Sequence, residues 1–148
     1  MKIISKNKKA TFNYFVLEKF RAGIVLVGSE IKAIREGKVN INEGFLRFFS
    51  DELFIVGMHI GNYSNQGYSN HENDRKRKIL LHKKELLKIS KKVESKGITM
   101  VPIQLFFDRN LVKIEFGLAK GKKQYDKRKS IKDRDIKKNI NISIRKKI

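Results

Sequence analysis

The chain has 148 residues, of which 40% are apolar, so it is long enough for one domain with its own core and is not disordered throughout. It carries 35 Lys and Arg against 15 Asp and Glu, a formal charge of +20, and this self-repulsion favours a polyanionic partner. Cysteine is absent, which excludes disulfides and thiolate metal sites and is typical of a reducing cytoplasm. We expect no signal peptide, no membrane-spanning helix and a cytoplasmic location, because the sequence has no apolar run of the required length.

The positive charge is clustered along the chain. Residues 120–148 hold thirteen Lys and Arg against three Asp, and residues 70–96 hold ten against four acidic residues. Residues 98–117, by contrast, are balanced, with two of each sign. A uniformly basic surface is the alternative, but clustering favours a polyanion. Nucleic acid is favoured over a membrane because no basic amphipathic helix with an aromatic face is present.

The first elements predicted are two strands and a helix. Residues 12–20, FNYFVLEKF, are rich in aromatic and β-branched side chains and predict a strand. Residues 22–28, AGIVLVG, form a short apolar run that predicts a second, buried strand. The spacing of apolar residues then changes to that of a helix in SEIKAIREG, residues 29–37. This segment predicts a helix capped by Ser29 and ended by Gly37.

Two β-hairpins are predicted further along the chain. In the first, residues 45–49 and 53–60 flank a short polar turn, and in the second, residues 98–107 and 111–117 flank Asp-Arg-Asn. Pro102 predicts an edge or a bulge, since proline cannot donate to a sheet ladder.

The segments around the second hairpin are more polar. Residues 61–74 form a loop rich in Gly, Asn and Ser, and residues 75–97 predict a helix with a narrow apolar stripe that ends at Gly97. RKRK, residues 75–78, would lie at the entrance of that helix, where an anion is favoured. Beyond residue 120, isoleucines spaced five, four and four apart predict only a weak helix, so we expect this tail to be disordered in the free protein and helical on a partner.

These elements predict a mainly β fold with flanking helices. About six short antiparallel strands and two helices favour a small closed barrel of the oligonucleotide-binding (OB) kind. We therefore expect an OB-like RNA-binding barrel domain over residues 1–119 and a basic C-terminal tail over residues 120–148.

The sequence offers little for enzyme chemistry. Three histidines lack any metal-binding context, no nucleophile motif is present, and the acidic residues are scattered among lysines. GLAKGKKQYDKR, residues 117–128, is not a nucleotide-phosphate loop: its glycines enclose three residues instead of four, and a second lysine stands where a hydroxyl is needed. No catalytic residue, metal or cofactor is predicted. Clustered cations with aromatic side chains instead suit RNA, whose phosphates and unpaired bases they bind.

Three blocks of the sequence resemble the SsrA-binding protein family, small protein B: residues 7–45, RKRKILLHKKEL at 75–86, and GLAKGKKQYDKRKSIKDRD at 117–135. They occur in order and span nearly the whole chain. The resemblance implies an OB-type barrel that binds the tRNA-like domain of transfer-messenger RNA at its elbow and rescues stalled ribosomes without catalysis. It also implies a tail that folds as a helix in the empty messenger channel, near the decoding centre.

The resemblance also implies site residues, by position. The surface that binds transfer-messenger RNA would include Asn7, Lys8, Lys9, Phe12, Tyr14, Arg21, Glu30, Lys32, Arg75, Arg77, Lys78 and Leu80. The tail residues that engage the ribosome would be Gly121, Lys122, Lys123, Tyr125, Asp126, Lys127 and Arg128. Tyr125 is a candidate for stacking on a ribosomal base. For Leu80, packing in the core is an equally weighted alternative to RNA contact.

Three positions depart from the family pattern. Arg21 stands where the family usually has Glu, so a charge is reversed. Phe12 replaces a usual His, which keeps stacking but loses a hydrogen bond, and Asn73 replaces a usual Pro. Two other readings remain open: a ribosomal or nucleoid structural protein whose tail only adheres to RNA, and an enzyme acting on RNA, for which no acid–base pair is present.

Overall fold

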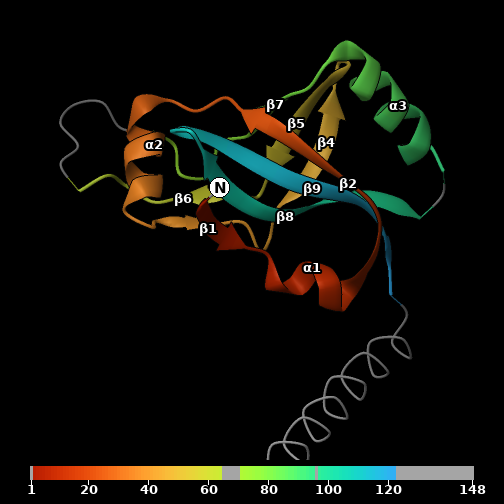
Figure 1. Ribbon diagram of the computed structural model, residues 1–148, viewed down its shortest axis with the longest axis horizontal. Coiled ribbons are helices and arrows are strands. Elements are labelled where there is room, and N and C mark those ends of the chain that lie inside the picture. Colours follow the sequence, from red (N-terminus) through yellow and green to blue (C-terminus); the bar gives the residue numbers. More distant parts are fainter. Residues whose placement is uncertain (1, 65–70, 96, 123–148) are drawn as a thin grey trace, which may run out of the picture.

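The computed structural model describes residues 2–64, 71–95 and 97–122, and within them a closed β-barrel is the central feature (Figure 1). The elements in chain order are β1 (Lys2–Lys6), α1 (Lys8–Asn13), β2 (Tyr14–Ile24), α2 (Gly28–Arg35), β3 (Val39–Asn40), β4 (Phe45–Phe49), β5 (Glu52–Val56), β6 (His59–Ile60), β7 (Arg77–Leu80), α3 (Lys83–Val93), β8 (Ile98–Asp108) and β9 (Leu111–Gly121). The large sheet has the order β1-β8-β4-β5-β7-β2-β9, and β9 pairs back onto β8. Six antiparallel strands therefore form a ring, which confirms the predicted mainly β barrel with flanking helices.

The barrel interior is filled by apolar side chains from the strands. Leu53 and Ile55 of β5 and Ile114 and Phe116 of β9 have no exposed surface. Successive side chains of a strand point to opposite faces, so β5 supplies every second residue to the core, whereas β9 is buried on both faces from Ile114 to Ala119. Burying one such side chain stabilises the fold by about 1.5–3 kcal/mol.

Two of the six ring strands differ from the prediction. The predicted strands at 12–20 and 22–28 are one continuous strand, β2, and the sixth strand of the ring is β7. That strand lies in the segment predicted to enter a helix, so α3 begins only at Lys83. β7 forms because Arg77 and Ile79 point inward and Ile79 pairs with Ile24 of β2.

The N-terminal segment is also more ordered than predicted. Phe12 lies in α1, and this short helix forms because the Asn7 side chain accepts a hydrogen bond from the amide of Lys9 and Ala10 is buried beside Val101. β1, which no local pattern predicted, pairs with residues 104–107 of β8.

Both predicted hairpins are confirmed. Their turns have two residues with positive φ, Ser50 with Asp51 and Arg109 with Asn110. Turns of this hand match the twist of the flanking strands. The predicted bulge is present as well, because the β8–β9 register shifts between Pro102 and Gln104.

The helices flank the barrel at three places (Figure 1). α2 begins at Gly28, one residue before the predicted cap, and the chain turns after it at Gly37, as predicted. α3 packs Ile89 fully into the core, with Leu86 and Val93 partly buried beside it. β9 runs through Gly121, two residues beyond the predicted domain boundary, and the tail from residue 123 lies outside the described residues.

Candidate nucleic-acid interface

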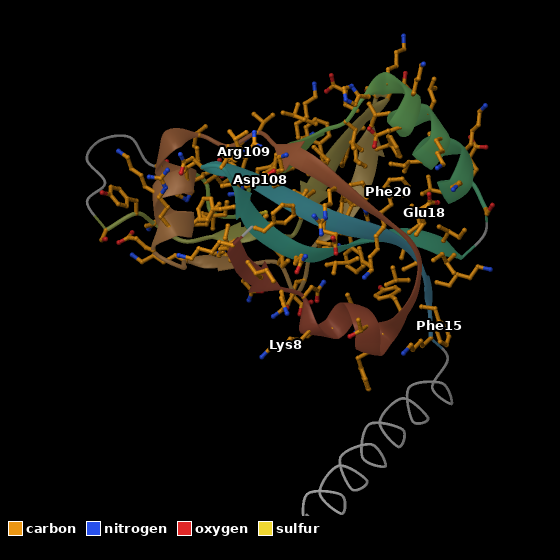
Figure 2. The ribbon with its side chains drawn as sticks, in the orientation of Figure 1. Lys8, Phe15, Glu18, Phe20, Asp108 and Arg109 are labelled. Atoms are coloured by element: carbon orange, nitrogen blue, oxygen red, sulfur yellow. The ribbon has the colours of Figure 1, made fainter. Side chains whose placement is uncertain are left out.

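One group of predicted RNA contacts gathers around α1. Lys8 projects from this helix into solvent (Figure 2), and Lys9 is exposed and pairs with Glu43. Phe12 is half-buried, and Tyr14 packs edge-on against Phe45 with ring centroids 6.5 Å apart. These side chains offer cations and aromatic edges on one side of the barrel, the combination that suits RNA.

Asn7 belongs to this group but has a structural task. Asn7 is only 7% exposed. Its Oδ1 caps α1, and its Nδ2 donates to the carbonyl oxygen of Pro102 at 2.8 Å. Asn7 therefore fastens α1 to β8, and it influences an RNA surface through the placement of that helix.

Two residues predicted for the tail lie against the same group. Gly121 pairs with Tyr14, and the amide of Lys122 donates to the carbonyl oxygen of Asn13 at 2.8 Å. The Lys122 ammonium lies 5.0 Å from the centroid of the Phe15 ring. Lys123, Tyr125, Asp126, Lys127 and Arg128 lie outside the described residues, so their predicted ribosome contacts stay predictions.

A second group lines a hollow of about 400 Å³ beside the junction of β2 and β7. Arg21 donates through Nε to Glu115 at 2.9 Å, and its guanidinium carbon lies 5.3 Å from the centroid of the Phe106 ring. Leu80, opposite Gly23 in the β2–β7 register, is 51% exposed, so it is not a core residue. Cationic and apolar side chains meet here on an accessible surface.

A third group surrounds the start of α2. Glu30 and Arg77 are ion-paired with both side chains fully buried, while Arg75 pairs with the same carboxylate and keeps 34% of its side chain exposed. Lys32 is exposed over the Tyr63 ring, with its nitrogen 5.3 Å from the centroid. The idea that RKRK lies at a helix entrance is thus wrong: Arg77 is in a strand and faces the core. Its inward direction depends on Glu30, far away in sequence.

The ionisation of Glu30 follows from these contacts. Burial by itself raises the pKa of this carboxyl, but hydrogen bonds from Arg75, from the amide of Val27 and from Arg77 outweigh it, so the pKa lies below the usual value. Lys78, the last cation of RKRK, is paired with Glu52 at 3.1 Å on the barrel surface.

Sequence reasoning missed three cation–aromatic contacts, made by Lys122 and Lys76. Phe15 is 48% exposed next to Lys122, and Lys76 lies over the rings of Phe49 and Phe54, 4.3 and 4.9 Å from their centroids. For Phe15, the alternation of side chains along β2 was a signal in the sequence that could have identified it as an outward-facing residue. Lys76 carried no such signal, because its partners come from the β4–β5 hairpin.

Other kinds of site are not found in the part of the chain that the structure describes. Over residues 2–64, 71–95 and 97–122, no three His, Cys, Asp or Glu residues come together as metal ligands. Among the helices formed by those residues, none is long and apolar enough to cross a membrane.

A closed antiparallel barrel with cations and aromatic side chains on its surface defines the class of small OB-like nucleic-acid-binding proteins. Comparison with known proteins specifies the family. The sequence model described as "SmpB protein" matches residues 4–146, so the chain belongs to the SmpB family.

Individual relatives agree with this assignment. The SsrA-binding protein of Christiangramia forsetii is 52% identical over 136 residues, 91% of this chain and 87% of the relative. That of Persephonella marina is 45% identical over 148 residues, all of this chain and 97% of the relative. A chain of the solved structure "tmRNA-SmpB: a journey to the center of the bacterial ribosome" is 43% identical, with a TM-score of 0.68 over 81% of this chain and 85% of that chain.

Proposed function

We propose that this protein is an RNA-binding factor of trans-translation. It binds the tRNA-like domain of transfer-messenger RNA, delivers that RNA to stalled ribosomes, and places its basic C-terminal tail in the empty messenger channel near the decoding centre. The observation that carries the proposal is the match, over four-fifths of the chain, to a protein solved with transfer-messenger RNA in the ribosome.

The geometry supports this function. Four of the accessible predicted contacts, Lys8, Lys32, Arg75 and Leu80, lie on the protein surface, and the first three can neutralise phosphates. Arg21 and Leu80 border a hollow beside the β2–β7 junction that offers space for a nucleotide. Lys122 is hydrogen-bonded to the end of α1, so the tail would start beside the barrel, which binds one RNA while the tail reaches another.

The proposal includes two further statements. The protein acts by binding and positioning, without catalysis. In support, Glu18 is engaged by Lys88 and Lys92, and Glu115 is engaged by Arg21. It acts in the cytoplasm, where ribosomes translate. Incubation of purified protein with labelled RNA should leave the RNA uncut, and specific cleavage would contradict the first statement.

The deciding experiment is a gel-shift competition between transfer-messenger RNA and ordinary tRNA. We expect a clear preference for transfer-messenger RNA and a logarithm of affinity that falls with the logarithm of salt concentration, by about 0.7–0.9 per phosphate contact. Equal affinity for random duplex DNA would instead favour a ribosomal or nucleoid structural protein.

A further inference from the structure

The starting point is the set of hydrogen bonds around Glu30, in the first turn of α2. Its Oε1 accepts from the amide of Val27 at 2.9 Å and from an Nη of Arg75 at 2.5 Å. Its Oε2 accepts from Nε of Arg77 at 2.6 Å. The Glu30 side chain has no exposed surface, so it has no direct route to an RNA ligand.

Arg77 is equally inaccessible. One Nη donates to the carbonyl oxygen of Met58 at 2.6 Å and the other to that of Asn73 at 3.1 Å. Its side chain, like that of Glu30, is 0% exposed. All three guanidinium nitrogens are engaged, so Arg77 neutralises Glu30 and ties β7 to the segments around it, and none of its charge faces solvent.

Arg75 differs from Arg77 in one respect. It binds the same carboxylate with one edge while 34% of its side chain stays exposed. The three side chains together carry one net positive charge, and Arg75 is the part of the cluster that reaches the surface. It also has no other ion-pair partner among the described residues.

We propose that Glu30 is a positioning residue for RNA binding: its buried carboxylate holds the guanidinium of Arg75 at the surface, in the orientation that meets an RNA phosphate. Arg77 is the inner counter-ion that keeps Glu30 charged in the barrel wall. A long side chain loses rotamer freedom when it binds, and holding Arg75 in advance removes part of that loss. The inference rests on the proposed function and assigns a role without RNA contact to two predicted contact residues.

The effect of one substitution on RNA affinity distinguishes this role from simple electrostatics, because the two predict changes in opposite directions. Glu30→Gln removes a negative charge, so long-range attraction alone predicts tighter binding of the RNA polyanion. Positioning predicts weaker binding, because the amide nitrogen of Gln places a donor against a guanidinium donor and releases Arg75.

The experiment measures binding of the full-length protein to transfer-messenger RNA by fluorescence anisotropy at several salt concentrations. Glu30→Gln and Arg75→Ala should each weaken binding about tenfold, the effect of losing one charge-assisted hydrogen bond. Each should lower the salt slope by about 0.7–0.9. The double variant should bind no more weakly than Arg75→Ala alone, since Glu30 acts through Arg75.

Two controls keep the result interpretable. Glu36→Gln removes a charge from the C-terminal end of the same helix, at a partly exposed carboxylate that pairs with Lys38 and accepts hydrogen bonds from Ser64, and should leave binding unchanged or slightly tighter. If Glu30→Gln is unfolded by circular dichroism, Glu30→Gln combined with Arg77→Met removes both buried charges together and should fold while binding just as weakly.

Two outcomes overturn the inference: equal or tighter binding by folded Glu30→Gln, or a Glu30→Gln loss that persists when Arg75 is already Ala. The second would assign Glu30 a purely structural role. Failure of the proposed function itself looks different, because the unmodified protein would then show no preference for transfer-messenger RNA over duplex DNA.

Discussion

Lys122 is fastened to α1 at two points: its amide donates to the carbonyl oxygen of Asn13 and its ammonium to that of Thr11, both at 2.8 Å. The chain therefore leaves the barrel from a fixed position beside β2. All of these bonds lie before residue 123. The part that follows can be removed without breaking any contact described for the barrel.

Deleting Gln124 to Ile148 tests this separation of roles. The truncated protein should keep its melting temperature within a few degrees and nearly all of its affinity for the tRNA-like domain, while rescue of stalled ribosomes is lost. Thermal unfolding, anisotropy and a reconstituted rescue assay measure the three quantities. Collapse of RNA binding would show that the tail is a general RNA adhesive.

Asn7→Ala should destabilise the protein by about 1–3 kcal/mol, because it removes the cap of α1 and leaves the carbonyl oxygen of Pro102 without its donor. Asn7→Asp keeps the capping oxygen but turns an oxygen toward that carbonyl, so it should also be less stable than the original. Urea unfolding measures both changes. Lys8→Ala, at an exposed neighbour, serves as the control and should stay within about 0.5 kcal/mol; an equal loss there would refute the capping argument.

The sequence predicted the features of the barrel that depend on local patterns. Both hairpins followed from alternating apolar residues around short polar turns, and the bulge followed from Pro102, which has no amide hydrogen to donate. The apolar stripe of α3 at Leu86, Ile89 and Val93 was likewise visible as helical spacing.

The features that local patterns could not predict depend on residues far away in the sequence. Nothing within RKRK distinguishes Arg77, which faces the core, from Arg75, which reaches the surface; the difference is the carboxylate of Glu30 and the carbonyl of Met58. In the same way, α1 replaces the start of a predicted strand because Asn7 bonds to Pro102, 95 residues away. Family resemblance located the candidate contacts, but it did not separate side chains that can touch RNA from those that support them.

Gly57→Ala should be strongly destabilising, by about 2 kcal/mol or more. Gly57 has φ +75°, and an added Cβ would lie 2.5 Å from the carbonyl oxygen of Glu43, closer than any real contact. Gly28→Ala is the matched control, because a Cβ there meets nothing within 4 Å and the residue begins α2. Chemical denaturation should show a loss at Gly57 and none at Gly28; similar values at both positions would contradict the steric argument.

Ile114→Ala and Leu111→Ala compare two residues of the same strand. Ile114 is fully buried and its truncation should cost about 2–5 kcal/mol, whereas Leu111 is 63% exposed and should change stability by less than about 0.5 kcal/mol. The midpoint of guanidinium unfolding measures the difference. If Leu111→Ala is equally harmful, the inside and outside faces of β9 have been misassigned.

The lowered pKa of Glu30 predicts an acid-sensitive contribution to stability. Burial opposes ionisation, but hydrogen bonds from Arg75, the Val27 amide and Arg77 outweigh it, so the folded pKa lies below the unfolded value of 4.5. The stabilisation is therefore complete above pH 4.5 and is lost as pH falls through the folded pKa. Urea unfolding at about pH 7, 5, 4 and 3 should show a steeper decline for the original protein than for Glu30→Gln.

Glu94→Gln is the control for this pH series, since Glu94 is exposed and has no ion pair among the described residues. It should follow the original protein over the whole pH range. Parallel curves for the original protein and Glu30→Gln would show that the Glu30 cluster contributes no pH dependence.

The pairing of β2 with β9 along nearly the whole length of β2 has a consequence for folding during synthesis. The ring cannot close until β9 has been synthesised, about 90 residues after β2. At synthesis rates of about 5–20 residues per second, that interval is roughly 5–20 s. During that time Phe15 and Phe20 lack their final neighbours, and long-range pairing of this kind is slow even after the chain is complete. A newly made chain thus passes through a prolonged open stage before the barrel closes.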